Sequence, residues 1–172
     1  MTTFTLLHTG VSLLPILFGL YALVRDGKID PQTRSGKWYL GTMLAGSVSS
    51  FGFIPVHGFT PGQVLTLITI ALLAIGTLTL RGQWRAPGYV QTIALTTSYL
   101  MLMVFATTEA LKRLPLNHPF ATGPTDPSLI PVRLTLLAIY LVVVGYQMLK
   151  IHAEHGPVAR LERLIAGYRH AA

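Results

Sequence analysis

The sequence contains no cysteine. Disulfide bonds, zinc sites with thiolate ligands, cysteine-held iron–sulfur clusters and thioether-attached haem are therefore excluded. Charge is also scarce: Asp, Glu, Lys and Arg make up 11% of the 172 residues, against about 25% in an average soluble protein. Acidic residues are rarest, with 6 Asp and Glu against 13 Lys and Arg. The shortage of charge excludes a disordered chain and argues against an ordinary soluble domain.

Long apolar runs take the place of charge. Hydrophobic residues make up 51% of the chain and the mean hydropathy is +0.55. Five segments each approach the ~20 residues that cross a hydrocarbon layer of ~30 Å: 4–24, 38–56, 63–80, 88–110 and 130–149. They lack the two-residue alternation of membrane barrel strands, which leaves helices as the structure that satisfies the backbone in lipid. We predict an all-α integral membrane protein with five transmembrane helices, the first retained because no basic region precedes it.

The basic residues predict the orientation. Ten of the thirteen Lys and Arg side chains follow the first, third and fifth spans, whereas only Lys112, Arg113 and Arg133 fall on the other side. The positive-inside rule then places the N-terminus outside and the C-terminus in the cytoplasm. We expect a multi-pass membrane protein. The basic surplus is explained by topology, so we expect the lipid bilayer and not nucleic acid as a partner.

The last residues predict a helix that lies on the membrane surface. Residues 1–151 form the expected five-helix bundle, and 152–172 form a cytoplasmic amphipathic tail helix. Apolar side chains of the tail share one helical face, while Arg160, Arg163 and Arg169 lie off it. This pattern is typical of an interfacial helix on an anionic leaflet. Docking to a partner protein is the alternative.

Two spans carry patterns that concern packing. Gly41, Ala45 and Ser49 recur every four residues in the second span, and small residues at this spacing let helices approach closely in lipid. We expect this face to pack on another helix, within the bundle or across a dimer. The fourth span is rich in hydroxyls, namely Thr92, Thr96, Thr97, Ser98, Thr107 and Thr108. Such groups bond to carbonyls of their own helix or line a polar cavity.

Ionisable residues near the outer ends of the spans are the candidate metal ligands. His8, His57, Glu109 and His118 come from four segments, and imidazole with carboxylate suits zinc, copper or non-haem iron, while two His suit haem. The ordinary alternatives are a His at the interface, solvated loop His residues, and a Glu109–Arg113 ion pair within one helix. No spacing as specific as H-E-x-x-H is present, so we expect no cofactor, with haem or a transition metal as the alternative.

Three motifs mark the first four spans: LLHTG early in the first, the basic turn and aromatic start of RSGKWYLG, and the Gly-containing turn LRGQWRAPG after the third. With these motifs, residues 5–114 resemble a widespread bacterial family of integral membrane proteins classed as a domain of unknown function. The resemblance implies His residues in turns where this chain has Gln32-Thr33-Arg34, Pro61-Gly62-Gln63 and Arg85-Ala86-Pro87, so only His8 matches. The resemblance supports the fold and implies a bacterial cytoplasmic (inner) membrane as the location. It also implies that a cofactor held by those histidines is lost here.

Three functions of different classes remain open. The first is a non-enzymatic accessory, scaffold or complex-subunit module, either homo-oligomeric or part of a larger membrane complex. The second is a metal- or haem-binding redox or sensing protein with its site at the outer face. The third is a small-solute carrier that uses the hydroxyls of the fourth span. No catalytic motif is present, which argues against an enzyme.

Overall fold

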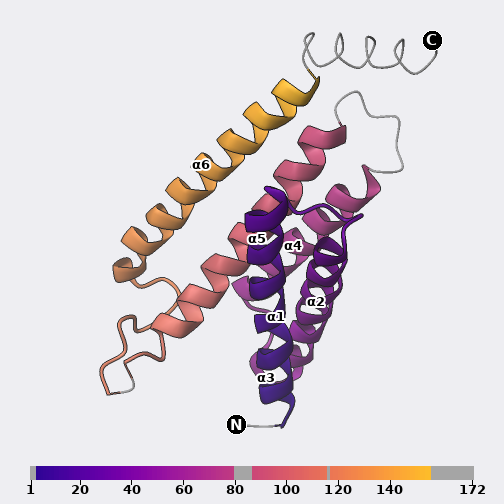
Figure 1. The fold of residues 1–172 in the computed structure, drawn as a ribbon. Coiled ribbons are helices and arrows are strands. Elements are labelled where there is room, and N and C mark those ends of the chain that lie inside the picture. Colours follow the sequence, from indigo (N-terminus) through magenta and orange to yellow (C-terminus); the bar gives the residue numbers. More distant parts are fainter. Residues whose placement is uncertain (1–2, 80–86, 116, 156–172) are drawn as a thin grey trace, which may run out of the picture.

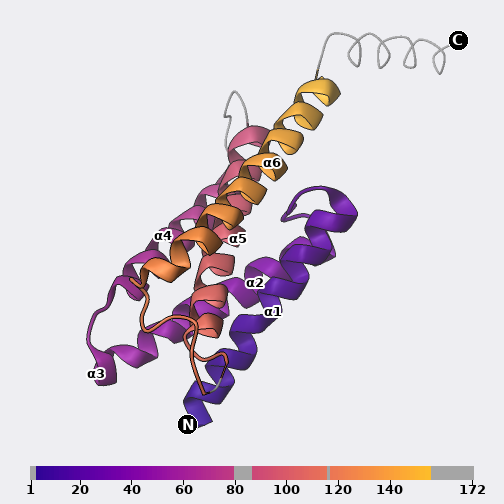
Figure 2. The same cartoon turned by 90° about the vertical axis from the view of Figure 1, so that its left-hand side faces the viewer.

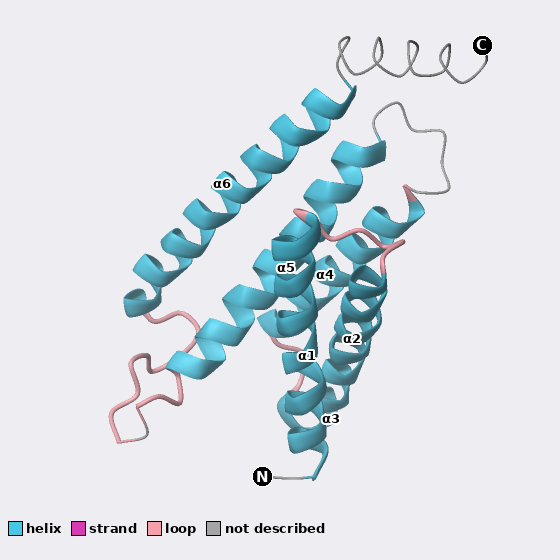
Figure 3. Ribbon diagram, in the orientation of Figure 1, coloured by secondary structure: helices cyan, strands magenta, loops and turns pink. Residues whose placement is uncertain are grey.

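The fold is known from a computed structural model that describes residues 3–79, 87–115 and 117–155. Within these ranges the chain is helical and has no strand (Figure 3). The longer helices are α1 (Thr3–Asp26), α2 (Arg34–Ser50), α4 (Pro61–Leu78), α5 (Pro87–Leu111) and α6 (Ile130–His155). The shorter elements are the 3₁₀ turns η1 (Phe51–Phe53) and η2 (Pro127–Leu129), and the four-residue helix α3 (Ile54–His57). The all-α prediction is thereby confirmed.

Four stretches are long and apolar enough to cross a membrane: Thr3–Asp26, Pro61–Leu78, Gly88–Leu111 and Pro127–Ala153. These coincide with the first, third, fourth and fifth predicted spans. The second predicted span, 38–56, is divided among α2, η1 and α3. Pro55 explains the division, because it has no N–H to continue the hydrogen-bond ladder of α2 and is tolerated in the first turn of α3. The 17 residues of α2 alone would span only about 26 Å.

The helices form two groups. α1 and α2 pack along each other as a hairpin, and α5 packs between α4 and α6. Figures 1 and 2 show these two groups from perpendicular directions. Contacts of α1 with α5 and of α2 with α4 join them. α5 is therefore the helix around which the others are arranged.

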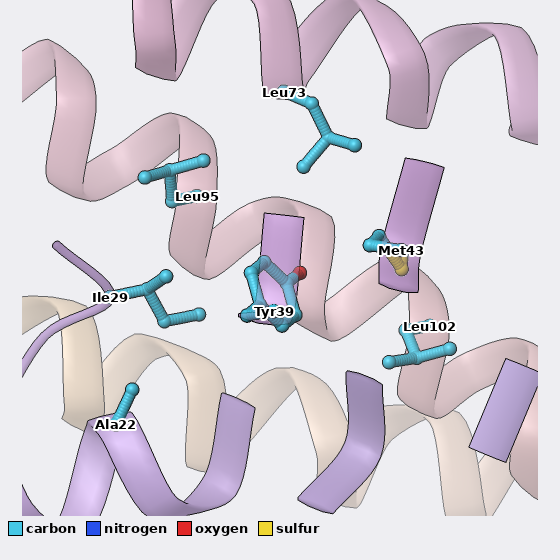
Figure 4. Packing of buried hydrophobic residues seen from close by; sticks show 7 residues of the cluster. All are labelled: Ala22, Ile29, Tyr39, Met43, Leu73, Leu95 and Leu102. Carbon is cyan, nitrogen blue, oxygen red and sulfur yellow. The ribbon is translucent and has the colours of Figure 1, made fainter. Parts of the chain in front are cut away.

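The core lies where the two groups meet. Figure 4 shows Tyr39 of α2 in the middle of a cluster to which α1, α4 and α5 also contribute. Tyr39, Leu95 and Ala22 are fully buried. Small residues bring the helices this close: a Cβ added at Gly76 would lie 2.6 Å from the Leu95 side chain, so the packing of α4 on α5 depends on glycine at this position.

The face of α2 that packs within the chain differs from the predicted one. Gly41 has no atom within 4 Å of an added Cβ, and Ala45 is exposed, so the predicted intrachain contact of these two residues is wrong. Only Ser49 contacts a neighbour, through a hydrogen bond to His8. α2 instead buries Tyr39, Met43 and Gly46, because the large Tyr39 ring occupies the core and turns the small-residue stripe outward. Contact of Gly41 and Ala45 across a dimer stays a prediction.

Candidate functional site

Polar side chains of α5 are bonded to every one of its long neighbours. The hydroxyl of Tyr39 on α2 lies 2.7 Å from that of Ser98, and both residues are fully buried. Ser98 donates its single proton to the Leu95 carbonyl of its own helix, 2.7 Å away. Tyr39 must therefore be the donor to Ser98. A neutral hydrogen bond in the core thus joins α2 to α5.

Two further contacts join α5 to α6. The Thr96 hydroxyl donates to Oε1 of Gln147 (3.0 Å), and the buried Gln147 amide donates through Nε2 to the Gly27 carbonyl after α1 (2.9 Å). The Thr97 and Tyr140 hydroxyls lie 2.7 Å apart. One glutamine side chain therefore connects three segments of the chain.

The remaining links run from α5 to α4 and α1. Nε2 of Gln91 donates to the Gly76 carbonyl (3.2 Å), and the Tyr99 hydroxyl donates to the Ile16 carbonyl (3.2 Å). Side-chain hydrogen bonds between membrane helices contribute about 0.6 kcal/mol each on average. Together these hydrogen bonds determine which face of each helix packs on α5. They therefore contribute more to the specificity of the fold than to its total stability.

The hydrogen bonds of the α5 hydroxyls bear on the two interpretations of its sequence, namely bonding within the helix and lining of a polar cavity. Thr97 and Thr107 donate to carbonyls of their own helix, 2.7 Å away in each case, as the simpler interpretation predicted. Thr96, Thr97 and Ser98 also bridge to other helices. The Thr92 hydroxyl is buried and has no hydrogen-bond partner among the described residues. Three of the six hydroxyls thus join α5 to other helices. The carrier hypothesis built on the hydroxyls stays a prediction.

His8 and Glu109, two of the candidate metal ligands, have partners nearby. Nδ1 of His8 lies 2.7 Å from the Ser49 hydroxyl, and its ring meets the edge of Phe53 at 5.0 Å between centroids. Glu109 accepts from Lys112 (2.7 Å) and Arg113 (3.2 Å), which directly follow α5. The second of these is the local ion pair given as the alternative for Glu109.

The other two candidate ligands leave the metal hypothesis open. His118 is exposed in the loop after α5, and the side chain of His57 is outside what the structure describes. Among the described residues, no three His, Asp or Glu side chains are grouped for a metal ion. Convergence of His8, His57 and Glu109 stays a prediction, because it depends on His57. Arg160, Arg163 and Arg169 of the proposed lipid-binding tail also lie outside the described residues.

One carboxylate organises the loop between α5 and α6, a structural role that the sequence analysis did not predict. Asp126 accepts hydrogen bonds from the backbone N–H groups of Thr122 (2.7 Å) and Ser128 (2.9 Å). These bonds, that of Thr122 first, hold the pKa of the Asp126 carboxyl well below its usual range, so it stays ionised. Arg133 of α6 donates to the Pro124 carbonyl and ties the loop to that helix. The Asp-Pro-Ser sequence, typical of a turn start, was the available signal.

Comparison with known proteins adds no assignment to this geometry. The chain matches no family model, no curated protein and no solved structure. The resemblance to the bacterial membrane family stays a prediction.

The Tyr39–Ser98 contact predicts unequal effects of removing its two hydroxyls. Ser98→Ala leaves the buried Tyr39 hydroxyl without an acceptor and should cost about 1–3 kcal/mol. Tyr39→Phe leaves Ser98 bonded to Leu95 and should cost about 0.6 kcal/mol. The stability of the double variant should be close to that of Tyr39→Phe alone. Unfolding midpoints in mild detergent measure these differences.

Thr107→Val serves as the matched control, because the Thr107 hydroxyl bonds only to carbonyls of α5. We expect it to change stability by at most about 0.5 kcal/mol. The two hydroxyls do not interact if Ser98→Ala and Tyr39→Phe lower the stability equally and the double variant shows the sum of the two effects.

Proposed function

We propose that the protein is a five-span membrane protein in which α2, η1 and α3 together provide the second span. Four apolar helices of sufficient length support the membrane setting. The helical stretch from Arg34 to His57 supports the fifth crossing, because its 24 residues would reach about 36 Å at 1.5 Å each. α2 is also joined to α5 by the buried Tyr39–Ser98 bond, so it belongs to the same bundle.

The proposed orientation has the N-terminus outside and the C-terminus in the cytoplasm of a bacterial inner membrane. Its support is the distribution of basic residues, ten of which follow the first, third and fifth spans. The turn between α1 and α2 and the end of α6 meet through the Gln147–Gly27 bond. This contact agrees with placing both on one membrane side.

The role we propose is that of a non-enzymatic accessory or scaffold subunit of a membrane complex. The observation that carries it is the exposure of α6: in an apolar stretch of 18 residues within Pro127–Ala153, only 6% of the residues are buried inside the chain. Val142 and Leu149 are each 73% exposed, while the polar groups of α6 at Tyr140 and Gln147 bond to α5. One side of α6 is thus fixed to the bundle, and its remaining apolar surface is free for lipid and for a partner helix.

Single cysteines in this cysteine-free chain test the orientation. Gln32→Cys changes an exposed residue of the α1–α2 turn, and Asn117→Cys changes an exposed residue of the loop after α5. A membrane-impermeant maleimide should label position 117 in sealed cells and position 32 only after the membrane is opened. Labelling of position 32 from outside would reverse the proposed topology.

A photoreactive residue at Val142 tests the subunit role in native membranes. We expect it to capture one protein of defined size, and the unmodified tagged chain to copurify with that protein in a fixed ratio. The same residue at fully buried Leu95 is the control and should give only intrachain products. A chain that is monomeric in mild detergent and forms only lipid adducts at position 142 would contradict the proposal.

A further inference from the structure

Exposed aromatic side chains gather on the outer side of the α1–α2 hairpin, close to its turn. The rings of Phe18 on α1 and Trp38 on α2 are stacked, with 5.8 Å between their centroids. Trp38 is 61% exposed, and Tyr21, three residues beyond Phe18 on α1, is 52% exposed. We call Phe18, Tyr21 and Trp38 the aromatic group.

Arg25 extends the aromatic group toward the turn. Its Nη1 donates to the Tyr21 hydroxyl (2.9 Å), and its guanidinium carbon lies 5.7 Å from the centre of the Tyr21 ring. Its Nε lies 3.7 Å from the Asp26 carboxylate, and 64% of the Arg25 side chain is exposed. Phe18, Tyr21 and Arg25 follow one another at steps of three and four residues, so they share one face of α1. This face is apolar at Phe18 and polar at Arg25.

The Tyr39–Ser98 bond explains why Trp38 lies on the outside. Tyr39 is fully buried and bonded to α5. Neighbouring residues of a helix are rotated by about 100° from each other. With Tyr39 fixed in the core, Trp38 is turned away from α5, where it meets Phe18.

The aromatic group lies beside a boundary between charged and uncharged sequence. In residues 3–79, every Asp, Glu, Lys and Arg falls in the stretch from Arg25 to Lys37. Arg25 is therefore the first charged residue of α1, and Lys37 directly precedes Trp38. Such a boundary is typical of the level at which a membrane protein passes from the hydrocarbon layer into the headgroups.

The lengths of the two helical segments agree with this level. The 20 residues from Trp38 to His57 would reach about 30 Å at 1.5 Å each, and the 19 residues from Thr3 to Tyr21 about 28 Å. Both lengths match a hydrocarbon layer of ~30 Å. With Trp38 and Tyr21 at one surface of this layer, the far ends of both segments reach the other surface.

We infer that the aromatic group and Arg25 lie in the headgroup layer of a phospholipid bilayer, in the leaflet on the side of the α1–α2 turn. Trp and Tyr favour this layer, because their rings are apolar while the indole N–H and the phenol hydroxyl bond to water and headgroups. Arg25 brings its guanidinium into the same layer while its carbon chain stays along α1. The inference rests on the proposed membrane setting but not on the proposed orientation. It makes lipid headgroups the partner of this surface and Trp38 the start of the second span.

Tryptophan fluorescence in lipid vesicles tests this placement. The chain has two tryptophans, so Trp84→Phe leaves Trp38 as the only one. The purified full chain with this change is placed in phosphatidylcholine vesicles whose acyl chains carry bromine, which quenches tryptophan, near either the carbonyl end or the methyl end. Bromine near the carbonyl end should quench Trp38 at least about twice as strongly, because the ring lies at the edge of the hydrocarbon layer.

The matched control is Val48→Trp in a chain that also carries Trp38→Phe and Trp84→Phe. Val48 is 57% exposed on α2 and lies ten residues beyond Trp38, which is about 15 Å along the helix and near the centre of the hydrocarbon layer. Bromine near the methyl end should quench this tryptophan more strongly than bromine near the carbonyl end.

Three other outcomes would overturn the inference. Stronger quenching of Trp38 by bromine near the methyl end would place it too deep. Weak quenching of Trp38 by both lipids, beside a normally quenched control, would show that protein and not lipid covers this surface. Absence of quenching in both proteins would overturn the membrane setting as well. No protein partner enters this experiment, so its result is separate from the test of the subunit role.

Discussion

The arrangement of the helices depends on hydrogen bonds between side chains of α5 and its neighbours. In an apolar surrounding, a polar group without a partner is costly, so pairs such as Tyr39–Ser98 and Thr96–Gln147 permit few alternative helix rotations. Leu95 then packs directly on Gly76, where no larger residue fits. Hydrogen bonding selects the faces, and close packing of those faces follows from it.

The same bonds account for what α6 leaves uncovered. Because Gln147 joins it to both α5 and the turn after α1, α6 has a fixed place in the bundle although little of its surface is buried. A helix anchored in this way can present apolar surface to lipid or to another protein without losing its own position.

Sequence patterns predicted the helical class and the segments of the long apolar helices, because both depend on local composition. Glu109 and Arg113 also paired as their spacing allowed. The packing face of α2 could not be predicted in this way. Gly41 and Ala45 do form a stripe of small residues, but it does not face another helix of this chain. The rotation of α2 is instead set by the bond of Tyr39 to Ser98, which lies 59 residues further along the sequence. A lone Gln147 in an apolar run was the missed signal for the contact with Gly27. The metal site predicted at the outer face stays untested, because the side chain of His57 lies outside what the structure describes.

Cysteine cross-linking in native membranes tests most directly whether the bundle is built on α5. Gly76→Cys with Leu95→Cys places the two cysteines where the Leu95 side chain packs against Gly76. The second change also removes the Leu95 side-chain atoms that an added Cβ at position 76 would meet at 2.6 Å. Leu78→Cys with Leu95→Cys is the control, since it leaves Gly76 in place and Leu78 of α4 is 60% exposed. Mild oxidation should join 76 to 95 and leave 78 and 95 unlinked. No linkage of 76 to 95, or equal linkage in both pairs, would contradict the arrangement around α5.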